Sequence, residues 1–180
     1  MRRAFLALLI AAPALAQTAA QKAELDRLFE LLKQAPSEEV AAPVEGRIWR
    51  IWNGAASPAV GLLMQRGMRN MDAQAWAPAL EDFDAALDLA PDFAEGWNKR
   101  ATARFMMGDL DGAVRDIQEV LKREPRHFGA LAALSTIAEE RRDDMAALRA
   151  YEAALAINPK MRGGEERLRE LKQKAYGEEM

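Results

Sequence analysis

Three prolines, Pro91, Pro125 and Pro159, are separated by 34 residues each, and this spacing is the strongest constraint on how the chain folds. The residues upstream of each proline repeat as well. We call the residues at the same distance before each proline a column. The columns twelve, eight, five and four positions before the proline are each apolar and close to one size. In that order they are Ala79, Ala113 and Ala147; Phe83, Ile117 and Tyr151; Ala86, Val120 and Ala154; and Leu87, Leu121 and Leu155. Further upstream, one column is small: Gly67, Ala101 and Ser135. A fixed period of this length indicates a repeat architecture with two helices in each repeat.

The repeated columns have a direct physical meaning. A small residue in the first helix and an alanine in the second let two antiparallel helices approach closely, while the large apolar residues fill the space to the next pair. The proline ends the second helix, because it cannot continue the hydrogen-bond ladder. One such pair cannot bury its apolar face, but neighbouring pairs cover each other. We therefore expect an all-helical solenoid.

This pattern resembles the tetratricopeptide repeat (TPR), a 34-residue helix-turn-helix with a Trp-Leu-Gly-Tyr first helix and an Ala-Phe-Ala-Pro second helix. The second-helix half matches in all three repeats. The first-helix half departs from the family pattern at Arg66 and Arg100, where leucine is usual, and at Asn70, Arg104 and Ala138, where tyrosine is usual. In addition, Asp144 replaces the apolar residue supplied by Trp76 and Leu110. The resemblance implies a right-handed solenoid of three repeats within residues 58–161, at about 60–93, 94–127 and 128–161.

The flanking segments are predicted to be helical. Leu25, Leu28, Phe29 and Leu32 form one apolar stripe at helical spacing, and a second stripe follows Ser37 and includes Ile48. We interpret residues 20–54 as a helical pair, a degenerate repeat ahead of the regular ones. Residues 164–177 carry apolar side chains on one face of a charged helix, which predicts a C-terminal cap.

The TPR resemblance implies that the first helices of successive repeats line a concave groove, which holds a peptide or a helix of a partner protein. Methionine adapts to apolar ligands of different shape, so a methionine-rich groove suits an apolar or helical segment. An equal alternative is that Met64, Met68 and Met71 form a stripe that packs against the preceding helical pair. The mapped groove residues are Met64, Met68, Met71, Asn98, Thr102, Phe105, Met106, Ala132 and Thr136.

Two further surface features bear on the choice of partner. TPR domains that bind chaperone tails resemble one another in a clamp of lysine, asparagine and arginine, but the corresponding positions here are Met64, Met68, Gly129 and Ala133, so no clamp is visible. Trp49 is a candidate for a second interface, because an exposed tryptophan is a good interface anchor. The alternative is that Trp49 closes the seam between the helical pair and the first regular repeat.

Composition excludes several classes of function. The chain has one histidine, His127, no cysteine and a formal net charge of -3. Paired-histidine and cysteine metal sites are therefore impossible, and the charge argues against a nucleic-acid partner. No phosphate-binding loop or nucleophile motif is present, so we expect no enzyme activity and no cofactor. Copper(I) binding by methionine thioethers remains as an alternative function.

The first sixteen residues are typical of a cleaved secretory signal: Arg2 and Arg3, an apolar stretch, and small residues at the end. The apolar run is too short to span a membrane, so no anchor is expected after cleavage. The twin-arginine route is disfavoured, because the basic region is minimal. We therefore expect a periplasmic adaptor that binds a protein or peptide client, with envelope assembly or cell division as the context.

Overall fold

The computed structural model describes residues 18–54 and 56–177 of the 180-residue chain. These residues form nine α-helices and no strand. The segment expected to be a signal, residues 1–16, lies outside the described residues. The helices are α1 (Ala19–Gln34), α2 (Glu38–Asn53), α3 (Pro58–Asp72), α4 (Trp76–Leu89), α5 (Ala94–Met106), α6 (Leu110–Arg123), α7 (Phe128–Glu140), α8 (Asp144–Ile157) and α9 (Gly164–Tyr176).

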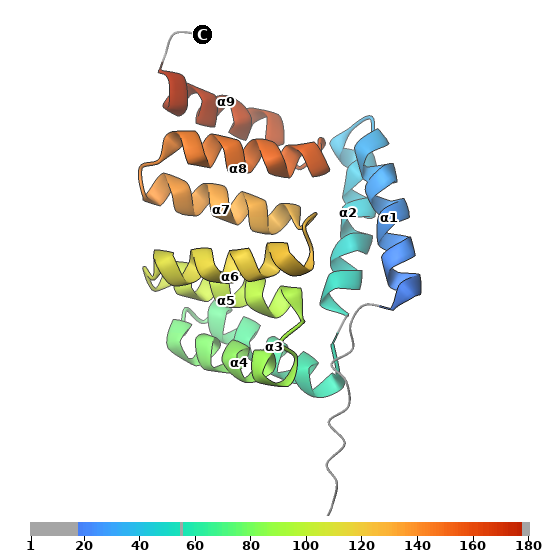
Figure 1. The fold of residues 1–180 in the computed structure, drawn as a ribbon, viewed down its shortest axis with the longest axis vertical. Helices are drawn as coiled ribbons and strands as arrows, with labels where there is room; N and C mark the ends of the chain where they lie inside the picture. Colours follow the sequence, from blue (N-terminus) through green and yellow to red (C-terminus); the bar gives the residue numbers. More distant parts are fainter. Residues whose placement is uncertain (1–17, 55, 178–180) are drawn as a thin grey trace, which may run out of the picture.

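Helices α3 to α8 stack as three antiparallel pairs, α3/α4, α5/α6 and α7/α8 (Figure 1). We call these pairs repeats 1, 2 and 3, their first helices the A helices and their second helices the B helices. Helix α9 packs on α8 and buries Leu171 in the last apolar cluster. The all-helical solenoid expected from the 34-residue period is confirmed.

The small column of the repeat marks the place where the A and B helices cross. A Cβ atom added to Gly67 would lie 2.5 Å from the Phe83 ring, far inside van der Waals contact. Ala79, Phe83 and Ala86 on the facing helix are all buried. In repeat 1 the column is therefore small because the ring of Phe83 occupies the space.

The turn inside each repeat contains one residue with a left-handed backbone. These residues are Gln74, Gly108 and Arg142, with φ values of 57°, 81° and 59°, and they stand 34 positions apart. Only repeat 2 places glycine there, although glycine adopts this conformation at the lowest cost. The B helices of repeats 2 and 3 then start with the side chains of Asp109 and Asp143 capping backbone N–H groups.

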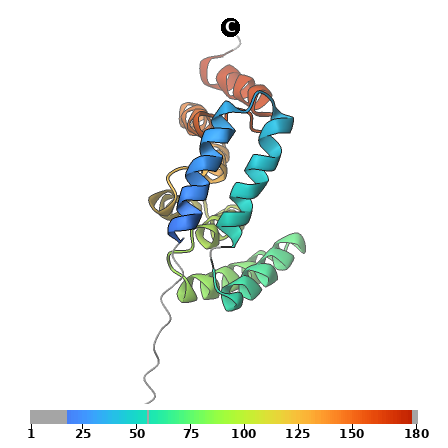
Figure 2. The same ribbon diagram turned by 90° about the vertical axis from the view of Figure 1, so that its right-hand side faces the viewer.

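The α1–α2 hairpin does not stack on repeat 1, so the expectation of a degenerate repeat in line with the others is wrong in its placement. The hairpin instead crosses the ends of α5 to α8, as Figures 1 and 2 show from two sides. The 34-residue register does not continue into the hairpin. The turn of the hairpin lies between Gln34 and Glu38, whereas the turn of repeat 1, between Asp72 and Trp76, falls at residues 39–41 when it is shifted back by 34 positions.

Candidate functional site

The candidate site is the surface that the three A helices share. Helix α5 contacts both α3 and α7, so these helices lie side by side. Met68, Thr102 and Thr136 stand 34 residues apart and therefore occupy equivalent positions on the three helices. All three are exposed, as is Met106 on α5. We call Met68, Thr102, Met106 and Thr136 the A-helix strip.

The strip combines two methionine side chains with two hydroxyl groups. Met68 is 37% exposed and Met106 is 47% exposed. The Thr102 hydroxyl donates to the Asn98 carbonyl at 3.1 Å, and the Thr136 hydroxyl donates to the Ala132 carbonyl at 3.3 Å. Both hydroxyl groups are therefore already bonded within their own helices.

The structure removes three residues from the predicted groove surface. Met64 is buried in the apolar cluster of repeat 1 with Val60 and Phe83, and it packs neither in an open groove nor against the preceding helical pair. Asn98 is buried and donates to Glu95 at 3.0 Å. Ala132 packs against the hairpin cluster. Each was predicted from its register position, which does not reveal what the neighbouring helix covers.

Two other predicted groove residues lie at the boundary between groove and core. Met71 is half-buried and packs against the apolar cluster of repeat 1. Phe105 is half-buried and packs against the cluster formed by repeats 2 and 3. Both side chains therefore stabilise the wall of the groove and present only part of their surface to it.

Arginine–aspartate pairs behind the strip were missed by the sequence analysis. In repeat 2, Asp116 accepts from both Nε and Nη2 of Arg100, at 2.9 and 2.7 Å, and its carboxylate lies 2.8 Å from Arg104 Nη1. In repeat 1, Asp82 accepts from Arg66 and from the Asn70 amide. The signal was present, because each arginine precedes its aspartate by 16 residues and both pairs follow the 34-residue period.

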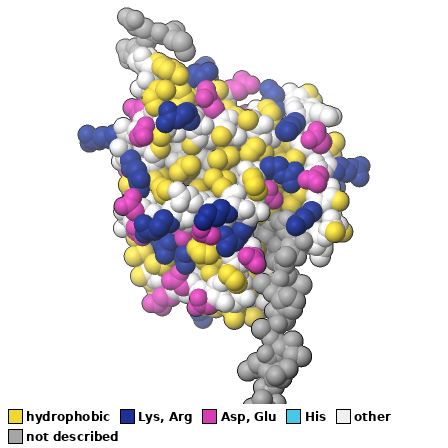
Figure 3. All heavy atoms as spheres, in the orientation of Figure 1, with side chains coloured by type: hydrophobic (Ala, Val, Ile, Leu, Met, Phe, Trp, Pro, Cys, Tyr) yellow, Lys and Arg dark blue, Asp and Glu magenta, His cyan; other side chains and the backbone are white. Residues whose placement is uncertain are grey.

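Repeat 2 is consequently more charged than repeat 3. In the orientation of Figure 1, Figure 3 shows apolar side chains gathered at the height of α7 and α8, and basic and acidic side chains at the height of α5 and α6. The positions of Arg100, Arg104 and Asp116 correspond to Leu134, Ala138 and Ala150 in repeat 3.

A buried polar group joins repeats 2 and 3. Glu95 of α5 is 1% exposed, and its carboxylate lies 3.1 Å from His127 Nε2 and 3.0 Å from Lys99 Nζ. Burial alone would raise the pKa of Glu95, but the hydrogen bond from His127 and the charge of Lys99 outweigh burial and hold this pKa below its ordinary value. His127 Nδ1 accepts from the Ala130 N–H at 3.0 Å, so Nε2 carries the proton that is donated to Glu95.

Aromatic side chains attach the hairpin to this buried group. The Trp52 ring stacks on His127, with ring centroids 4.2 Å apart and an angle of 8° between the planes. Trp49 meets His127 and Phe128 edge-on at 5.4 and 5.6 Å. Trp49 is half-buried and lies against repeat 3, so the alternative that it closes a seam with repeat 1 is wrong, and its role as a second interface stays a prediction.

Neither His127 nor Met64 is open to a metal ion in this arrangement. Both nitrogens of His127 are engaged by protein groups, and Met64 is buried. Among residues 18–54 and 56–177, no cluster of histidine, aspartate or glutamate side chains has the geometry to hold a metal ion. Within the same residues, no helix combines the length and the apolar character needed to cross a bilayer.

A TPR repeat-containing protein of Rhizobium etli is 37% identical to the chain over 156 residues, which cover 87% of the chain and 76% of that protein. The chain belongs to the tetratricopeptide-repeat family. No protein-family model matches this TPR chain. Solved TPR domains share its fold. The TPR domain of Sgt2 from Aspergillus fumigatus superposes with a TM-score of 0.61 and is 22% identical in sequence. The match covers 66% of this chain and 80% of the Sgt2 domain. The TPR2B domain of yeast Sti1, solved in complex with pHsp70, covers 67% of the chain and is covered over 96%, at a TM-score of 0.58 and 21% identity.

Proposed function

We propose that this TPR chain is a non-catalytic adaptor that binds a protein or peptide segment along the A-helix strip. The exposed, equivalent positions of Met68, Thr102 and Thr136 on three adjacent A helices carry the proposal. The Sti1 TPR2B domain, which has the same fold, was solved in complex with pHsp70 and supports a role in peptide binding.

The chemistry of the strip favours an apolar client. Two exposed methionines with unbranched side chains can adapt to apolar side chains of different shape. A carboxylate clamp is not available at the corresponding positions, since Met64 is buried and Trp49 covers Gly129. Lys99 is already paired with Glu95. The client is therefore an amphipathic helix or an extended apolar segment, and not an acidic chain end.

The test is a charge introduced on the strip. Met68→Glu combined with Met106→Glu should lower client capture by at least about tenfold, because a carboxylate must be desolvated against an apolar ligand. Met145→Glu is the matched control, since Met145 is 38% exposed but lies on the B helix α8. A substitution at Phe105 is unsuitable for this test, because the loss of its contacts with the core would unfold the repeat.

Capture is measured by photo-crosslinking from position 102, an exposed strip position that neither substitution changes, in intact cells, followed by identification of the attached protein. Thermal unfolding of the double variant should stay close to that of the Met145→Glu control. Undiminished capture by a folded Met68→Glu, Met106→Glu variant would remove the strip from the binding surface.

We also propose that the chain is exported to the periplasm of a Gram-negative bacterium, where its client belongs to envelope assembly or cell-division machinery. The sequence of residues 1–16 supports export. Cell fractionation with mass spectrometry of the mature chain should find the protein in the periplasm with Gln17 at its N-terminus. A cytoplasmic chain that keeps residues 1–16 would refute this part of the proposal.

A further inference from the structure

The hairpin has an apolar core of its own. Leu25, Leu28, Phe29, Leu32, Ala35, Ala41, Ile48 and Trp52 are buried together. From the solenoid, only Phe128 and Ala154 enter this cluster as buried residues. The three other apolar clusters of the described residues contain no side chain of α1 or α2. Most of the apolar packing within α3 to α9 therefore lies in clusters that the hairpin does not enter.

The contacts between hairpin and solenoid include buried polar groups beside the apolar and aromatic ones. Trp52 Nε1 donates to Glu124 at 3.3 Å, and the Asn158 amide donates to Glu45 at 3.0 Å. Both solenoid residues are buried beneath the hairpin, and Asn158 Oδ1 has no hydrogen-bond partner there. Water can satisfy these groups when the hairpin leaves, so separation costs less than opening an apolar core. Polar contacts of this kind are typical of interfaces that form and dissociate.

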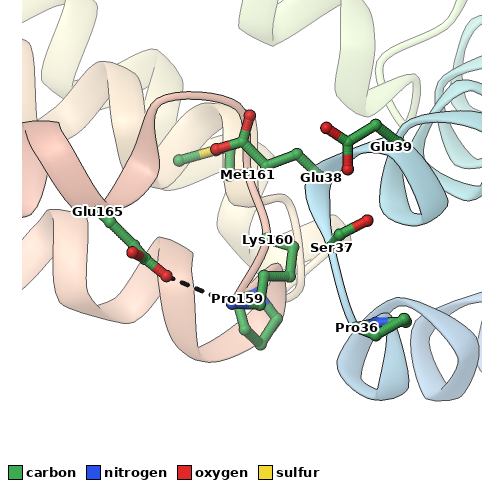
Figure 4. A pocket seen from close by; sticks show the side chains of 8 residues that line it. All are labelled: Pro36, Ser37, Glu38, Glu39, Pro159, Lys160, Met161 and Glu165. Carbon is green, nitrogen blue, oxygen red and sulfur yellow. Dashed lines mark hydrogen bonds and ion pairs between the residues drawn. The ribbon is translucent and has the colours of Figure 1, made fainter.

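The turn of the hairpin is also loosely fitted. A cleft of about 260 Å³ lies between residues 36–39 of the hairpin turn and the connection from α8 to α9 (Figure 4). Glu38 reaches across to the backbone N–H of Gly163 at 3.1 Å, while Lys160 pairs with Glu165 on the solenoid side. At this end of the hairpin, the hydrogen bond between Glu38 and Gly163 lies beside an open cleft, and Met161 packs against the hairpin cluster.

The solenoid surface beneath the hairpin is shaped for two aromatic side chains. We call His127, Phe128, Gly129, Ala132, Ile157 and Met161 the seat. Trp49 and Trp52 stand one helical turn apart and both insert into it. A Cβ atom at Gly129 would lie 2.7 Å from Trp49 Cη2, so the absence of a side chain there makes room for the indole ring.

We propose that the seat is a second protein-binding surface and that the hairpin is its resident, displaceable ligand. The partner that replaces it is an amphipathic helix with two aromatic side chains one turn apart, the chemistry that α2 itself presents. Helix α2 ends at Asn53 and α3 begins at Pro58, so a displaced hairpin stays tethered and competes for the seat. The inference goes beyond the proposed function, because the seat contains no residue of the A-helix strip.

The test measures binding of a fluorescein-labelled peptide spanning residues 18–53 to the full-length chain by fluorescence anisotropy. Trp52→Ala weakens the resident hairpin and leaves the seat intact, so the peptide should bind this variant at least tenfold more tightly than it binds the wild type. Trp49→Ala is the second variant, in case Trp52→Ala lowers the amount of folded protein. Circular dichroism shows whether the solenoid is folded in each.

A chemical crosslink between the hairpin and the solenoid provides the matched control. Arg126 Nη1 and Asp26 Oδ1 lie 2.7 Å apart across the interface, and the chain has no cysteine. Asp26→Cys and Arg126→Cys in the Trp52→Ala background can therefore be joined by a bis-maleimide at one defined place. Peptide binding should be present before this crosslink and lost after it.

Two results would overturn the inference: no peptide binding to the folded tryptophan variants, or equal binding before and after the crosslink. Met68→Glu in the Trp52→Ala background should leave peptide binding unchanged. A peptide that lost affinity there would lie on the strip and not in the seat, so the two surfaces are tested separately.

Discussion

Repeats 2 and 3 follow the same 34-residue register but join their two helices with different chemistry. In repeat 2, Arg100 and Arg104 of α5 share the buried Asp116 of α6. In repeat 3, the same three positions are Leu134, Ala138 and Ala150. Both pairs pack, because the three positions change together. The register determines which positions of the two helices contact each other. Either ionic or apolar side chains can occupy these positions.

The largest expected effect comes from breaking the ionic set. Asp116→Ala leaves two arginines without their shared carboxylate and should lower the free energy of unfolding by about 3 kcal/mol in urea titration. Asp82→Ala in repeat 1 should cost clearly less, because the Arg66 side chain is 60% exposed and can turn to water. Equal losses from the two variants would show that burial of the arginines does not matter.

The polar link between the two repeats gives a pH-dependent prediction. The pKa of Glu95 is lowered in the folded chain, so this carboxylate stabilises the fold above its ordinary pKa of 4.5 and loses that effect as pH falls through the lowered pKa. Glu95→Gln should cost about 2 kcal/mol at pH 7, and this difference should shrink in acid. Chemical unfolding at several pH values measures it.

The exposed Glu166→Gln controls for the removal of one carboxylate from the chain. A Glu95→Gln variant that differs from the wild type by the same amount at pH 7 and at pH 3 would contradict an ionised Glu95 in the link.

The smallest effect is expected when repeat 2 receives the complete apolar set. Arg100→Leu, Arg104→Ala and Asp116→Ala together should stay within about 1 kcal/mol of the wild type, since a buried ion pair is often replaceable by apolar residues. Thermal and urea unfolding compare this triple variant with Asp116→Ala alone. If the triple variant unfolds as readily as the single one, the two sets are not interchangeable.

The sequence predicts the repeats well because the information is periodic. The columns at Gly67, Ala79 and Phe83 recur twice more, so each contact is specified three times. The A-helix positions of Met68, Thr102 and Thr136 follow from the same register. All three residues are exposed, and their place in a binding groove stays a prediction.

Contacts outside the period could not be predicted in this way. Trp52 and His127 are 75 positions apart and belong to no repeated column, so nothing local indicates their stacking. Asn98 occupies a groove position in the register, but Glu95, one turn away, draws its side chain into the interior. The Arg100 and Asp116 pair was accessible in principle, because both residues recur in repeat 1 at the same separation.

The contacts of the hairpin also depend on the number of repeats in the array. Helix α2 leads into α3 at the start of repeat 1, and the hairpin packs against repeats 2 and 3. Its contacts therefore match an array of three helix pairs. An inserted or deleted 34-residue unit between repeats 1 and 2 would move the fastening point by a full helix pair. Duplication is the ordinary route by which solenoids change size. In this chain, duplication of a repeat would separate the hairpin from the helices that it now contacts.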